Sequence, residues 1–158
     1  MQKYTWFYSL PNPLDPAFQA KLQTQFDTFS HQWKSHGAEV EGQIGILRNQ
    51  FVVVRSNEQD DRPSGCSIDG MKRSVESILT AAGLSWLDAA HVFYEGDDGS
   101  VAYTHFSKIS ALIGEGKLTP DTLILDHTLG QSDDLSRWEV LLKDSWLKRF
   151  LPREQASL

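Results

Sequence analysis

Apolar and polar side chains alternate with clear periods along the first third of the chain. Residues 4–9 combine β-branched and aromatic side chains and stop before Pro11, which predicts a first strand. Apolar side chains then recur every three or four residues, which is typical of the buried stripe of an amphipathic helix. The stripe is formed by Phe18, Leu22, Phe26, Phe29 and Trp33. Asp15 and Pro16 mark the start of this helix, and Gly37 marks its end.

Two apolar segments in the middle of the chain predict a hairpin followed by a second helix. Residues 40–46 alternate with period two, and the apolar run 51–54 follows after a short polar connection. The polar stretch 56–65 predicts an exposed loop. The helical period then returns from about residue 66 to residue 82, with the apolar face Met71, Val75, Ile78, Leu79 and Ala82.

The last third of the chain predicts shorter elements. Residues 91–94 and 101–103 flank a connection rich in Gly and Asp, which favours another hairpin. A third helix is expected over 106–113 and a sixth strand over 122–125. The tail has the helical spacing Trp138, Leu141, Leu142, Trp146 and Phe150, although Ser145 is also able to cap a separate last helix.

The predicted order is βαββαβ followed by βαβα. Its first six elements match the split βαβ arrangement of ferredoxin-like folds. We therefore expect the α+β class, with a mostly antiparallel sheet, helices packed on it and a C-terminal extension. No repeat or long linker interrupts the sequence, so one domain is predicted over residues 1–158.

Composition narrows the classes of function. The formal net charge is −6, which disfavours nucleic acid as a partner because a polyanion is repelled. Uninterrupted apolar runs reach only four residues, so neither membrane insertion nor a signal peptide is expected. The single cysteine, Cys66, has no internal disulfide partner, which favours a reducing, cytoplasmic location.

The most suggestive chemistry lies at the predicted start of the second helix. Ser64, Gly65, Cys66 and Ser67 occupy the place where a helix presents unpaired amides and a partial positive charge. Such amides bind anions, and the same field stabilises a thiolate. His36 is the candidate base for a reactive Cys66. Alternatively, a serine only caps the helix and the cysteine is buried as a small apolar side chain.

Motifs for common cofactors are missing from the sequence. Neither a Gly-x-x-x-x-Gly-Lys-Ser/Thr loop nor a Gly-x-Gly-x-x-Gly turn occurs, and no two histidines have the spacing of a helical or strand metal site. We therefore predict no cofactor and no metal ligand.

Three segments resemble an uncharacterised family of small bacterial proteins. They are Gln-Trp-Lys-Ser-His-Gly at 32–37, Phe-Val-Val-Val at 51–54 leading to Ser-Gly-Cys-Ser-Ile-Asp at 64–69, and Trp-Glu-Val at 138–140 with Lys-Asp-Ser-Trp at 143–146 and Arg-Phe at 149–150. Members of that family are often labelled automatically as ABC transporter ATPases, and this label does not fit a chain without a phosphate-binding loop. The resemblance implies no reaction. If its three segments converge, they form a cleft suited to a small polar ligand. That cleft combines Trp33, His36, Cys66 and Asp69 with some of Trp138, Asp144, Trp146 and Arg149.

Two hypotheses of function follow from these residues. The first is a module that binds a small anionic ligand or a protein partner, with residues 64–67 as its anion-receptive helix N-terminus. The alternative is a thiol-dependent enzyme or redox sensor that uses Cys66.

Overall fold

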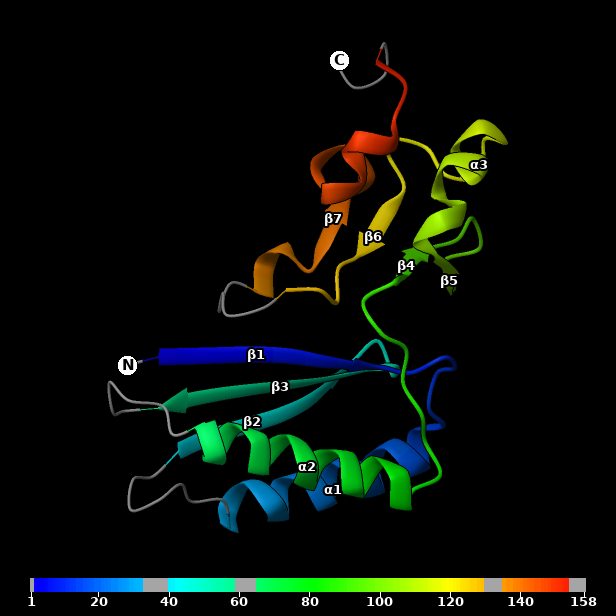
Figure 1. Cartoon of the computed structure of the whole chain (residues 1–158). Helices are drawn as coiled ribbons and strands as arrows, with labels where there is room; N and C mark the ends of the chain where they lie inside the picture. Colours follow the sequence, from blue (N-terminus) through cyan, green and yellow to red (C-terminus); the bar gives the residue numbers. More distant parts are fainter. Residues whose placement is uncertain (1, 33–39, 59–64, 130–134, 154–158) are drawn as a thin grey trace. The chain divides into compact units, whose positions relative to one another are not determined.

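The computed structural model describes residues 2–32, 40–58, 65–129 and 135–153 (Figure 1). The chain has the predicted α+β class, with two antiparallel sheets. It divides into two compact units, residues 1–87 with 129–133, and residues 88–128 with 134–158. The prediction of one domain over residues 1–158 stays a prediction.

The sheet of the first unit has three strands of eight residues each. β1 (Gln2–Ser9), β3 (Phe51–Glu58) and β2 (Val40–Leu47) lie in that order, and both neighbouring pairs are antiparallel. The predicted hairpin is therefore confirmed. Arg48 and Asn49 turn the chain with φ angles of 51° and 59°, in the left-handed region that tight turns use.

Two helices cover one face of this sheet, as Figure 1 shows. α1 (Pro16–Gln32) begins where the sequence predicts, because the Asp15 carboxylate accepts hydrogen bonds from the Ala17 and Phe18 amides at 3.1 and 3.3 Å. α2 (Gly65–Ala81) starts one or two residues earlier than predicted.

The apolar stripes of both helices meet the sheet in one core. Its fully enclosed members include Leu22, Phe26, Val52, Val54, Met71, Val75 and Leu79. Phe29 is only half-buried, and Phe18 is 37% exposed, so the predicted stripe is wrong at its first position. Phe18 lies in the first helical turn, where residues 15–17 are exposed as well. Trp33 and Gly37 lie outside the described residues.

The ferredoxin-like core is not formed. Such a core needs a fourth strand in the sheet of β1, but among the described residues after α2 a single isolated bridge reaches that sheet, between Leu87 and Ser9. The Leu87 amide donates to the Ser9 carbonyl at 2.9 Å. The next strand, β4 (His91–Glu95), instead joins the second sheet. The order of the first six elements was predicted correctly, but the fourth strand does not pair with the sheet of β1.

The second unit contains a four-stranded sheet of short strands. β5 (Val101–His105), β4, β6 (Leu123–Leu125) and β7 (Glu139–Leu141) lie in that order, and all neighbouring pairs are antiparallel. α3 (Ile109–Gly114) follows β5, as predicted. The core of this unit consists of Val92, Ile109, Leu118, Ile124, Leu142, Leu147 and Leu151.

The predicted C-terminal α-helix is wrong. Its first part forms β7, because residues 139–141 pair with β6. Two 3₁₀ turns follow, Leu142–Asp144 and Trp146–Phe150. The Ser145 hydroxyl accepts a hydrogen bond from the Leu147 amide at 3.1 Å and caps the second turn. The alternative prediction, a separate last helix capped at Ser145, therefore had the correct start, although the segment is a 3₁₀ turn.

Among the described residues, no helix is both long and apolar enough to cross a bilayer.

Candidate functional site

At the predicted anion site, the structure describes the backbone of residues 65–67. Ser64, Trp33 and His36 lie outside the described residues. Gly65, Cys66 and Ser67 form the first turn of α2, so the stretch does begin a helix. Asp69, in the next turn, is exposed. Anion binding by residues 64–67 and thiolate chemistry at Cys66 stay predictions.

The predicted C-terminal site residues divide into buried and exposed side chains. Trp138 is only 9% exposed, whereas Trp146 is 38% exposed. The Arg149 guanidinium carbon lies 5.3 Å from the centre of the Trp146 ring and 4.9 Å from that of Phe150. The structure therefore brings Trp146 and Arg149 together in the second unit. Cys66 and Asp69 belong to the first unit, so the cleft shared by all three motif segments stays a prediction.

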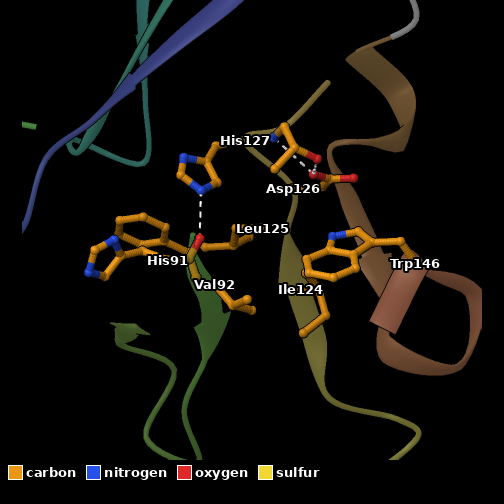
Figure 2. A pocket seen from close by; sticks show the side chains of 9 residues that line it. His91, Val92, Ile124, Leu125, Asp126, His127 and Trp146 are labelled. Carbon is orange, nitrogen blue, oxygen red and sulfur yellow. Dashed lines mark hydrogen bonds between the residues drawn. The ribbon is translucent and has the colours of Figure 1, made fainter. Parts of the chain in front are cut away.

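A shallow hollow opens beside Trp146 (Figure 2). It lies between the start of β4, the end of β6 and the last 3₁₀ turn. Its lining consists of His91, Val92, Phe93, Ile124, Leu125, Asp126, His127, Thr128 and Trp146. Its cavity volume is about 10 Å³. Sites for drug-sized ligands typically measure about 300–1,000 Å³, so this hollow is too small to enclose such a ligand.

His127 enters the hollow from the loop that follows β6. An Asx turn holds this loop, because the Asp126 carboxylate accepts from the Thr128 amide and hydroxyl at 2.9 and 2.5 Å. The His127 Nε2–H donates to the His91 carbonyl at 2.7 Å, as Figure 2 shows. The edge of the Phe93 ring faces the same imidazole at a centroid distance of 5.0 Å. Burial lowers the pKa of His127, so the ring is neutral in this setting.

A second pair of imidazoles lies on β4 and β5. His91 is directly opposite His105, and the two rings are perpendicular with centroids 5.7 Å apart. The Asp88 carboxylate accepts from the His91 Nδ1–H at 2.9 Å. This hydrogen bond and a second one from the Ala90 amide hold the pKa of Asp88 below its usual value.

The two opposing rings have different tautomers when they are neutral. His91 carries its proton on Nδ1, because a carboxylate only accepts. His105 lacks the Nδ1 proton, because that nitrogen accepts from the Ser107 amide at 3.2 Å and caps the next turn. The pair therefore offers one accepting Nε2 and one donating Nε2, an arrangement that does not present two lone pairs to one metal ion. In the described ranges, no three His, Cys, Asp or Glu side chains are grouped so that they could hold a metal.

The three histidines of the second unit were missed by reasoning from sequence. One signal was available in part: residues 94 and 101 flank the predicted turn, which pairs 91 with 104, one residue short of the observed pairing of 91 with 105. Nothing local to residue 127 indicated that its ring would share the lining of a hollow with Trp146. The aromatic and imidazole rings of this region come together only through strand pairing.

No family model, curated protein or solved structure matches this chain. The resemblance to the small bacterial family stays a prediction, and the site has to be interpreted from its own geometry.

Proposed function

We propose that the protein is a partner-binding module, and that its contact surface consists of Trp146, Arg149, Phe150 and the adjoining hollow. We call this group the Trp146 surface. The observation that carries the proposal is a partly exposed indole that stacks with a guanidinium at the mouth of a small apolar hollow. Tryptophan and arginine are the residues most enriched among those that dominate the energy of protein interfaces.

The size of the hollow favours a protein partner over an independent small ligand. A cavity volume of about 10 Å³ does not enclose a small ligand, whereas the Trp146 and Phe150 rings beside it offer a surface for contact. Partner contact removes the exposed part of the indole from water, which contributes about 25 cal/mol for each Å² buried. We place this binding in the cytoplasm because a single cysteine suits a reducing compartment.

Site-specific photo-crosslinking tests the proposal in living cells of the source organism. Trp146 is replaced by a benzoyl-phenylalanine in one variant, and Phe18 in a matched control. The two side chains are almost equally exposed, at 38% and 37%, but Phe18 lies on α1 of the first unit. We expect a discrete crosslinked partner from position 146 and none from position 18.

Binding to the crosslinked partner is then measured by calorimetry with purified proteins. Trp146→Ala should weaken binding at least about tenfold, as expected for a central interface tryptophan, while Phe18→Ala leaves it unchanged. Equal crosslinking at both positions, or equal affinity of the two alanine variants, would rule out the Trp146 surface as the contact surface.

The start of α2 gives a second candidate site, an anion-receptive helix N-terminus. The supporting observation is that α2 begins at Gly65, inside the predicted stretch. Sulfate titration at low salt tests it: Gly65→Val should weaken binding and Cys66→Ala should preserve it if the thiol is passive. If Cys66 is instead a catalytic or sensing thiolate, its alkylation should have a half-point well below about pH 8.5. An absence of sulfate binding by the wild type would refute the anion site.

A further inference from the structure

β5 forms one edge of the four-stranded sheet in the second unit. Among the described strands, β4 alone pairs with it, and none of its five residues is buried. Exposed sheet edges are usually protected by charged side chains or proline, because they otherwise pair with another strand. β5 has the sequence Val-Ala-Tyr-Thr-His, without Lys, Arg, Asp, Glu or Pro, whereas the opposite edge strand, β7, has only three residues and carries Glu139. β5 is therefore the less protected edge of this sheet.

The backbone of β5 presents hydrogen-bonding groups along this edge. Hydrogen bonds in an antiparallel pair alternate along each strand. The Phe106 amide donates to the Ala90 carbonyl at 2.8 Å, which fixes the alternation in the register of β4 and β5. The amides of Val101, Tyr103 and His105 consequently point away from β4, as do the carbonyls of Val101 and Tyr103. An added strand would thus meet both donors and acceptors.

The sequence around Tyr103 is complementary to itself in the antiparallel direction. When two copies of β5 pair with Tyr103 opposite Tyr103, residues at equal distances before and after this position lie opposite each other. Ala102 then faces Thr104, and Val101 faces His105. Tyr103 is 42% exposed, so this pairing also removes aromatic surface from water.

Opposite charges flank the strand at equal distances from Tyr103. Asp98 lies five residues before this position, and Lys108 lies five residues after it. The Asp98 carboxylate accepts from the Ser100 amide and hydroxyl at 3.0 and 2.6 Å, and these bonds hold its pKa below the usual value. Lys108 is exposed and makes no ion pair with any residue that the structure describes. Antiparallel pairing brings Asp98 of one copy to the Lys108 end of the other, whereas parallel pairing in register would bring like charges together.

From this complementarity we infer that β5 pairs with the β5 of a second copy of this chain, antiparallel and centred on Tyr103, so that two sheets join across a two-fold axis. The inference goes beyond the proposed function, because it uses a different surface and a different partner. Pairing over five residues buries less than the roughly 1,000 Å² of a stable interface, so the dimer is weak. Its dissociation constant should lie between about 10 μM and about 1 mM.

Disulfide trapping tests the register in the full chain. In a Cys66→Ala background, one variant carries Tyr103→Cys and a matched control carries Phe106→Cys. The two aromatic side chains are almost equally exposed, at 42% and 41%, but only position 103 lies on the inferred two-fold axis. Opposed residues of an antiparallel pair have Cα atoms about 5.5 Å apart, which suits a disulfide. Under oxidation by air we expect a covalent dimer from Tyr103→Cys and none from Phe106→Cys.

Sedimentation equilibrium measures the dimer without a covalent link. Tyr103→Lys should weaken dimerisation at least about tenfold, because two like charges then lie opposite each other. Lys108→Glu should weaken it about threefold, and high salt should reduce this effect, because exposed ion pairs contribute little and are screened. Lys117→Glu changes an exposed lysine of the same unit outside β5 and should leave dimerisation unchanged. Thermal unfolding confirms that each variant is folded.

The outcomes separate this inference from the proposed function. A wild type that stays monomeric at about 1 mM overturns the β5 dimer, and so does a dimer that Tyr103→Lys leaves intact. Equal trapping of the two cysteine variants, or equal effects of Lys108→Glu and Lys117→Glu, overturns the register centred on Tyr103 and with it the inference. The crosslinking at position 146 decides independently whether the Trp146 surface binds a partner.

Discussion

The two units of the chain use their aromatic and apolar side chains differently. The first unit has strands of eight residues and helices of seventeen, and its periodic apolar faces form one core. The second has strands of three to five residues, and it leaves Tyr103, Phe106 and Trp146 at least one-third exposed. The long helices bury most of their apolar stripes, although Phe18 of α1 is 37% exposed, whereas the short strands and 3₁₀ turns leave three aromatic rings at the surface. The proposed contact surface belongs to the less regular unit.

The largest effect is expected in the core of the first unit. Phe26 is completely buried against the sheet, so Phe26→Ala should lower the free energy of unfolding by about 3–5 kcal/mol, through lost burial and a cavity. Gln25→Ala, at the exposed neighbouring position, should change it by less than about 0.5 kcal/mol. Urea unfolding measures both. Equal shifts of the two midpoints would show that the helical stripe is assigned wrongly.

A smaller effect is expected where β2 faces Met71 of α2. A Cβ atom at Gly42 of β2 would overlap the terminal methyl group of the buried Met71 side chain, whereas a Cβ at Gly45 would meet no atom within 4 Å. Because the overlapped atom is the free end of a flexible side chain, Gly42→Ala should destabilise the protein by only about 1 kcal/mol through overpacking. Gly45→Ala on the same strand is the control and should be close to neutral. If Met71→Ala does not relieve the effect of Gly42→Ala, the overlap is not its cause.

The second unit should respond to pH through His127. Burial lowers the pKa of this imidazole below its ordinary value of 6.5, so the unfolded chain binds a proton more readily than the folded one. The stabilisation from the neutral ring is present above about pH 6.5 and is lost as the pH falls through the lower, folded pKa. Urea midpoints at about pH 7.5 and about pH 5.5 should thus differ less in His127→Gln than in the wild type. An unchanged difference would mean that His127 does not contribute to this pH dependence.

Several local features followed from the sequence alone. The start of α1 at Asp15–Pro16, the hairpin around Arg48 and Asn49, and the start of α2 near Cys66 depend on residues close to one another in the chain. Capping, turn and periodicity signals act over a few residues, so a single sequence is enough to identify them.

Contacts between distant residues were decided by the tertiary structure. The hairpin of β4 and β5 formed as predicted, but β4 paired with β6 in a second sheet and did not join the sheet of β1, and residues 139–141 became a strand because an edge of β6 was available to them. Trp138 and Trp146 have the same side chain and lie eight residues apart, yet one is buried and the other lies at the mouth of a hollow. The helical period predicted that both indoles lie on one face of a helix. The chain instead forms β7 and two 3₁₀ turns here, so the two side chains have different surroundings. Periodicity reports which face of an element is apolar, but only the folded chain determines what covers that face, because the competing partners lie far apart in the sequence.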